Sequence, residues 1–223
     1  MFDRIAPRYD MLNRVLSFGT DIGWRRRAVA LARLGAGERA LDIGAGTGDL
    51  AFALLASSAA SASVVGADIS PRMLSVSVRR AERLPVRGRY AALLASAEEL
   101  PLPDASIDRV ISGFTLRNIG DLPRALRELR RVLRPSGRVV LLELSHPTEP
   151  IFAALYHLYF DHILPPVASR LGGDVEAYRY LPRSLRAFPG AAELAELMRE
   201  SGFTHVRFER LTMGIAAIHI GET

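Results

Sequence analysis

The 223-residue chain contains no cysteine and no lysine. Without cysteine it can form neither disulfides nor thiolate metal sites, and it has no cysteine nucleophile. Its five histidines are at positions 146, 157, 162, 205 and 219. Only His157 and His162 come near a metal-ligand spacing, so we expect no metal.

Long apolar runs are also missing. No segment approaches the ~20 apolar residues that span a bilayer, and the first residues lack the layout of a signal peptide. The sequence therefore predicts a cytoplasmic protein. All 29 basic residues are arginines, which gives a net charge of +5 and a pI near 10.2. Such a balance permits contact with nucleic acid or an anionic membrane surface, although solvated arginines are its commoner cause.

A glycine-rich turn stands between two predicted elements. Residues 40–43 read as a short buried strand, Gly44, Gly46 and Gly48 follow at alternate positions, and a helix opens at Asp49. Glycine lets a ligand approach the backbone closely, so this pattern favours a bound nucleotide over simple packing.

Asp49, at the start of the predicted helix, helps to decide which nucleotide binds. A dinucleotide-binding loop would have its third glycine there, close to the pyrophosphate. A carboxylate repels pyrophosphate but suits the ammonium and sulfonium groups of S-adenosylmethionine (SAM). Asp42, at the end of the first strand, adds a second negative charge.

A second apolar strand ends at Asp68, 24 residues beyond Gly44. An acid at this place should meet ribose hydroxyls. Together the turn and Asp68 resemble the SAM-binding fingerprint of class I methyltransferases. The alternative is a glycine-rich turn in another doubly wound fold, with Asp68 as a helix cap.

Strand and helix patterns alternate along the rest of the chain. Helices are predicted at 21–34, 50–60, 71–83, 122–133 and 191–201, and strands at 40–43, 63–68, 90–95, 107–113, 138–144, 204–211 and 215–221. Pro135 to Gly137 read as a turn. The alternation predicts one α/β domain, a doubly wound and mostly parallel sheet of Rossmann-like type, with a ligand crevice at the carboxyl ends of the strands. The last two strands should form an antiparallel edge hairpin.

Two parts of the chain are expected to embellish this sheet. Residues 1–34 should form an N-terminal helical cap, and residues 146–190 an insertion on the substrate side. In the helix at 21–34, Trp24 and Ala28 lie on the predicted buried face, whereas the arginines at 25, 26, 27 and 33 point toward water. A membrane or substrate-tail role for these arginines is the alternative.

Several segments resemble the ubiquinone/menaquinone biosynthesis C-methyltransferase family over nearly the whole chain. They are Met1–Asn13, Leu116–Asn118, Gly173–Asp174, Ala177–Ser184 and Phe188–Pro189. The resemblance implies methyl transfer from SAM to a ring carbon of a prenylated quinol, either demethylmenaquinol or its benzoquinol counterpart. The acceptor could bring the protein into peripheral contact with the inner face of the membrane. The oligomeric state stays open, a homodimer included.

The resemblance and the residue pattern together predict a cofactor site and its neighbours. The predicted cofactor residues are Asp42, Gly44, Gly46, Thr47, Asp68, Ile69, Met73, Ser96, Ala97, Glu98 and Gly113. Tyr9, Tyr178, Tyr180 and His157 are candidate substrate-pocket residues, or aromatic core residues with satisfied polar tips. Two positions depart from the family pattern: Gly113 replaces a usual serine, with Thr115 as a nearby hydroxyl, and Ser96 replaces Asp or Asn.

Arg117 and Asn118 are the predicted catalytic residues. A phenol titrates near ~10, so forming a quinolate at neutral pH needs a cation or a base nearby. Arginine stays protonated, so Arg117 would stabilise the quinolate or hold a proton-accepting water. The alternatives are an ion pair with Asp121 for Arg117 and a helix cap for Asn118.

Two other functions compete with quinol methylation. An RNA methyltransferase would use the positive charge, but the sequence shows neither an RNA-binding module nor a catalytic Asn-Pro-Pro-Tyr or cysteine motif, so we expect no nucleic-acid partner. The third hypothesis is a SAM-binding scaffold or regulatory protein without catalytic activity.

Overall fold

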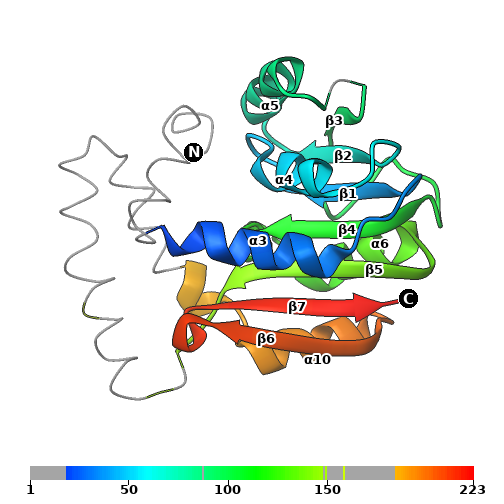
Figure 1. Ribbon diagram of the computed structural model, residues 1–223. Helices are drawn as coiled ribbons and strands as arrows, with labels where there is room; N and C mark the ends of the chain where they lie inside the picture. Colours follow the sequence, from blue (N-terminus) through cyan, green and yellow to red (C-terminus); the bar gives the residue numbers. More distant parts are fainter. Residues whose placement is uncertain (1–18, 87, 148, 150–157, 159–183) are drawn as a thin grey trace.

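A seven-stranded sheet forms the centre of the computed structural model, which describes residues 19–86, 88–147, 149, 158 and 184–223. The strands are β1 (Arg39–Ile43), β2 (Ser63–Asp68), β3 (Tyr90–Leu94), β4 (Ile107–Gly113), β5 (Leu133–Leu144), β6 (Thr204–Leu211) and β7 (Ala216–Glu222). Their order is β3-β2-β1-β4-β5-β7-β6. Neighbours from β3 to β5 pair in parallel, whereas β7 pairs antiparallel with both β5 and β6 (Figure 1). The predicted fold class is confirmed.

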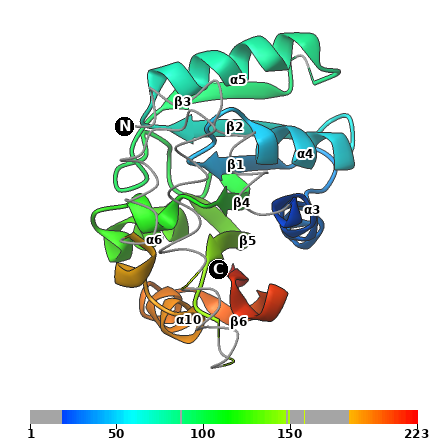
Figure 2. The ribbon, with the colours of Figure 1, turned by 90° about the vertical axis from the view of Figure 1, so that its left-hand side faces the viewer.

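Helices cover both faces of the sheet. One face packs against α3 (Thr20–Ala32) and α4 (Asp49–Ser57), and the other against α6 (Leu122–Val132) and α10 (Ala191–Glu200), while α5 (Pro71–Arg83) lies beside β2 and β3 (Figure 2). Alternate residues of a strand point to opposite faces. In β5, Val140 and Leu142 therefore join the α3–α4 core, whereas Val139 and Leu141 join the α6–α10 core. No helix within the described residues is long and apolar enough to span a membrane.

The start of β5 differs from the prediction. A turn was expected at Pro135 to Gly137 before a strand from Arg138, but the strand begins at Leu133. Pairing with β4 jumps from Ile107 opposite Leu133 to Arg109 opposite Arg138. Residues 134–137 therefore bulge out of the pairing, and Ser136 has φ +64°. The turn residues form an irregularity inside the strand instead of preceding it.

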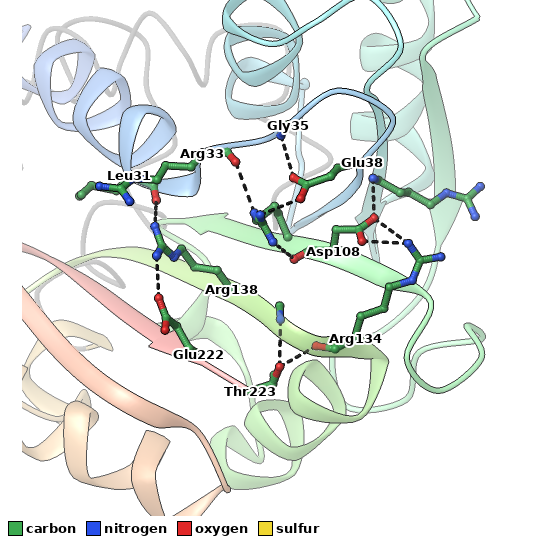
Figure 3. Close-up of polar contacts among 12 residues, drawn as sticks. Leu31, Arg33, Gly35, Glu38, Asp108, Arg134, Arg138, Glu222 and Thr223 are labelled. Atoms are coloured by element: carbon green, nitrogen blue, oxygen red, sulfur yellow. Dashed lines mark hydrogen bonds and ion pairs between the residues drawn. The ribbon is translucent and has the colours of Figure 1, made fainter.

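Arginine side chains fix the C-terminal end of α3 to the amino-terminal edge of the parallel strands (Figure 3). Arg138 donates to the carbonyl of Leu31 at 3.2 Å and pairs with Glu222 at 2.6 Å. Glu38, just before β1, pairs with Arg109 of β4 at 2.7 Å. Figure 1 shows that α3 runs antiparallel to β1, so its first turns lie at the opposite edge, where the parallel strands end.

His219 is a buried polar residue on the α10 side of β7. Its Nε2 lies 2.7 Å from the carbonyl oxygen of Ala191, and its ring contacts that of Phe208. Burial lowers the pKa of His219 to about 4, so the imidazole is neutral at pH 7. A carbonyl only accepts hydrogen bonds, so Nε2 carries the proton.

We predict that His219 weakens the fold in acid. Its pKa is about 4 when folded against a usual 6.5, so between these values only the unfolded chain gains the proton. As the pH falls from 7 to 4, the unfolding free energy should drop by up to about 3 kcal/mol relative to His219→Gln. Glutamine keeps a donor for Ala191 but does not titrate. Urea unfolding at several pH values measures the difference, and parallel profiles for the two proteins would contradict this role.

Candidate active site

The turn between β1 and α4 requires glycine at two positions. Gly44 has φ +65° and Gly48 has φ +91°, in the left-handed region that other residues rarely adopt. A Cβ on Gly44 would lie 2.1 Å from Oγ1 of Thr115, and one on Gly48 would lie 2.4 Å from the ring of Phe52. The turn therefore packs tightly against the segment after β4 and against the first turn of α4.

Asp68 ties this turn to the end of β2. Its Oδ2 accepts from the N–H of Gly46 and its Oδ1 from the N–H of Ser70, both at 2.8 Å. A carboxylate oxygen has a second lone-pair direction, so Asp68 can still accept from a ligand hydroxyl. Ser70 caps α5 by accepting from the N–H of Met73. The reading of Asp68 as a helix cap is therefore wrong.

A cavity of about 390 Å³ opens beside the turn. This volume lies within the range of small-molecule sites. Ten of the eleven predicted cofactor residues line it: Gly44, Gly46, Thr47, Asp68, Ile69, Met73, Ser96, Ala97, Glu98 and Gly113. Ile69 is 70% exposed, an apolar side chain at the edge of the cavity that a flat ligand could cover.

Asp42 is the eleventh residue, and it lies behind the cavity wall. Its side chain is buried, with Oδ2 accepting from the N–H of Ala51 in α4 at 3.0 Å. Its Oδ1 has no hydrogen-bond partner among the described residues. Burial raises the pKa of Asp42 to about 7. At neutral pH this carboxyl is therefore poised between its protonated and ionised forms.

Asp49 lines the cavity, but its charge is compensated. Arg80 of α5 pairs with Asp49 at 2.7 Å and donates to the carbonyl of Thr47 at 2.9 Å, with its guanidinium over the ring of Phe52. The electrostatic preference of Asp49 for a cationic ligand is therefore weakened, because Arg80 offsets its charge. Asp68 remains as a carboxylate held by neutral backbone groups.

Arg117 and Asn118 form a short 3₁₀ helix, η1 (Leu116–Asn118), after β4. Arg117 pairs at 2.5 Å with the buried Glu143 near the end of β5, and not with Asp121. Asp121 instead caps α6 by accepting from the N–H of Arg124. Asn118 therefore does not cap α6, and its buried Oδ1 has no partner in the described part of the chain. No local sequence pattern predicted that Glu143 would meet Arg117.

The departure at Gly113 has a packing explanation. A Cβ at this position would lie 2.6 Å from Cδ1 of Leu50, so a serine would displace that side chain. Thr115 lines the same cavity, and its hydroxyl lies 3.3 Å from the Gly113 carbonyl and 3.4 Å from that of Gly44. A hydroxyl is thus present close to the position where the family pattern has one.

A second cavity of about 720 Å³ adjoins the first, and both include Ile119 and Gly120 in their walls. Arg117 lines the second cavity, whereas Asn118 lines the first. The wall of the second is mixed. Leu122, Pro123, Phe188, Pro189 and Leu197 are apolar, whereas Ser184, Arg186 and Glu193 are polar or charged. No group of three or more potential metal ligands occurs in the described residues.

Four predicted substrate-pocket residues lie outside the described residues. They are Tyr9, Tyr178, Tyr180 and His157. The same holds for most of the predicted cap at 1–34 and of the insertion at 146–190. In the described part of the cap, Arg26, Arg27 and Arg33 are exposed as predicted, but Arg25 is not: it lines the first cavity.

The sheet order, the glycine turn and the strand-end acid define the class I SAM-dependent methyltransferase fold. A SAM-dependent methyltransferase from Aquifex aeolicus has a similar structure, with a TM-score of 0.64 and 16% identity over 89% of this chain and 88% of that one. The [4+2]-cyclase SpnF gives a TM-score of 0.73 and 19% identity over 100% of this chain and 93% of its own. At these identities the likeness shows the fold alone, and a fold does not fix the reaction.

The chain belongs to the ubiE/COQ5 methyltransferase family, whose model matches residues 1–223. A demethylmenaquinone methyltransferase of Thermus thermophilus is 49% identical over 100% of this chain and 99% of its own length. A ubiquinone/menaquinone biosynthesis C-methyltransferase of Syntrophotalea carbinolica is 48% identical over 99% of this chain and 92% of its own. The family resemblance in the sequence is confirmed.

We predict that Asp42→Asn changes how stability depends on pH. The pKa of Asp42 is about 7 when folded against a usual 3.8, so as the pH rises between these values only the unfolded chain loses the proton. The ionisation of Asp42 therefore lowers the unfolding free energy by up to about 4 kcal/mol from pH 4 to pH 8. Asp42→Asn, which does not titrate, should lack this decrease. Urea unfolding across this range measures the effect. Glu82→Gln, an exposed change on α5, is the control, and an unaltered profile in Asp42→Asn would refute the assignment.

Proposed function

We propose that this protein transfers a methyl group from SAM to a ring carbon of a prenylated quinol in menaquinone or ubiquinone biosynthesis, with demethylmenaquinol as the acceptor. Membership of the family over the whole chain supports the reaction class. The names of relatives at 48–49% identity support quinone biosynthesis. The observation that carries the proposal is the pair of adjoining cavities with η1 between them.

The first cavity fits SAM in its size and in its mixture of polar and apolar groups. We assign the ribose hydroxyls to Asp68, the adenine to Ser96, Ala97, Glu98, Ile69 and Met73, and the methionyl part to Gly44, Gly46, Thr47 and Gly113, with Asp42 behind them. When bound, SAM supplies an electrophilic methyl group on a positively charged sulfur. A positive charge at the turn favours the ionised form of Asp42.

We place the quinol in the second cavity, with its ring at the wall that the two cavities share. The apolar side chains of this cavity suit a prenyl tail, and Ile119 and Gly120 border both spaces. A ring placed there would have Arg117 on its own side and Asn118 on the cofactor side. Because a prenylated quinol is held in a bilayer, we also propose that the protein meets its acceptor at a membrane surface.

Arg117 and Asn118 are assigned to the ring oxygen. Methylation forms a carbon–carbon bond, breaks the carbon–sulfur bond and releases a ring proton, and it is fastest when the ring is electron-rich. Asn118 Oδ1 is a buried acceptor without a partner in the described chain, so it suits a quinol O–H. Glu143 fixes the orientation of the Arg117 guanidinium, which can stabilise the quinolate or hold a proton-accepting water.

We predict that only the reduced acceptor is methylated. An oxidised quinone ring is itself electrophilic, so it does not attack an electrophilic methyl group. The assay combines purified protein, SAM and a short-chain demethylmenaquinone, with and without dithionite, and uses mass spectrometry to find one added methyl on carbon. Equal methylation under oxidising conditions, or a methyl on oxygen, would rule out this mechanism.

We predict that Arg117→Lys lowers turnover by about tenfold or more, which is ~1.4 kcal/mol in the barrier, and leaves the affinity for SAM unchanged. Lysine keeps the charge opposite Glu143 but replaces the planar fork by a point charge. Calorimetry with SAM and the quinol assay measure the two quantities. Arg124→Lys, on the exposed side of α6, serves as the matched control.

A change in stability must be separated from this effect. Removing the Arg117 charge altogether would leave Glu143 buried and uncompensated, at a cost of about 3–5 kcal/mol, so Arg117→Ala is the poorer test. Thermal unfolding of Arg117→Lys should therefore accompany the kinetics. Normal turnover in a folded Arg117→Lys variant would reduce Arg117 to a structural ion-pair partner.

A further inference from the structure

Arg25 occupies a different environment from the other arginines of α3. Arg26 and Arg27 are exposed, and Arg27 pairs with Glu209 of β6 at 2.9 Å. The Arg25 side chain is only 17% exposed and lines the first cavity. Among the described residues that line this cavity, Arg25 is the only basic one. The acids in the same wall are Asp49, Asp68 and Glu98.

The guanidinium of Arg25 has few contacts of its own. Its Nε lies 3.5 Å from Oδ2 of Asp21, too long for a good hydrogen bond, and this nitrogen is buried without a hydrogen-bond partner in the described chain. Its central carbon lies 5.1 Å from the centre of the Phe114 ring. No described residue accepts a hydrogen bond from Arg25. A partly buried guanidinium normally has an acceptor, so a guanidinium that lines a cavity and has no described acceptor indicates a ligand that carries one.

The side of the cavity on which Arg25 lies indicates which part of the cofactor it would contact. Asp68 ends β2, and Ser96 to Glu98 follow β3, whereas Phe114 follows β4. In the sheet order β3-β2-β1-β4, the adenine and ribose residues therefore lie on one side of the glycine turn and Phe114 on the other. Arg25 contacts Phe114, so it lies on the side left for the amino-acid end of the cofactor.

We propose that Arg25 binds the α-carboxylate of the methionyl part of SAM. This carboxylate is the one anionic group of the molecule at neutral pH, and a planar carboxylate matches the donor fork of arginine. The assignment rests on the proposed use of SAM. The guanidinium already lies over the Phe114 ring and near Asp21, so the side chain is positioned before the cofactor arrives.

The experiment measures the binding of SAM and of decarboxylated SAM, which lacks only the carboxylate, by calorimetry. Arg25→Ala should bind SAM about 10- to 100-fold more weakly than the wild type, the range of a charged hydrogen bond, and should bind decarboxylated SAM as well as the wild type does. The affinity of Arg25→Lys for SAM should lie between those of the wild type and Arg25→Ala. Arg26→Ala removes an exposed arginine from the next position of the same helix and should change neither affinity.

Each other outcome overturns the assignment in a recognisable way. Equal loss of affinity for both ligands would mean that Arg25 only supports the shape of the cavity. Unchanged SAM affinity with lowered turnover on the quinol would place Arg25 at the acceptor oxygen. If the wild-type protein bound neither ligand, the proposed function would fall together with this assignment, a result distinct from a loss confined to Arg25 variants.

Discussion

The hydrogen bond from the N–H of Gly46 to the carboxylate of Asp68 is the contact on which the site depends. It joins the turn after β1 to the end of β2, and the close approach of Gly44 to Thr115 joins the same turn to the segment after β4. Three neighbouring strand ends thus fix one stretch of backbone. Because the turn is held before any ligand arrives, binding does not have to order it, and the ordering cost is met during folding.

Two of the three acids around this turn do not present a full free charge, so a count of acids overstates the negative potential of the cavity. Arg80 compensates Asp49, and burial keeps Asp42 near half-protonation at neutral pH. A cation in the cavity would favour the ionised form of Asp42, and by linkage ionisation of Asp42 would strengthen the binding of that cation. The ionisation of this buried acid therefore responds to the charge of the ligand.

The sequence predicted the sheet because its signals are local. Ser70 and Pro71 mark the start of α5, and the strands predicted at 63–68 and 107–113 match β2 and β4 residue for residue. Arg25 and Glu143 were missed because their roles depend on distant neighbours. Arg25 borders the apolar stripe of α3, and only Phe114, brought there by β4, makes that border the wall of a cavity. Glu143 follows a buried run and meets Arg117 through the pairing of β4 with β5, which no local pattern specifies.

The buried ion pair between Arg117 and Glu143 connects η1 with the end of β5 at a cost in desolvation free energy. Removing two charges from water usually costs more than their attraction returns, so apolar side chains of the same volume would often give a more stable protein. What apolar side chains cannot supply is an oriented donor at the boundary of two cavities. The pair fixes the guanidinium with the Phe114 carbonyl as a second acceptor, at 2.8 Å, and so holds it in one direction. Under the proposed function this orientation is what the pair contributes, because methyl transfer to a single ring carbon requires the ring to be held in one orientation.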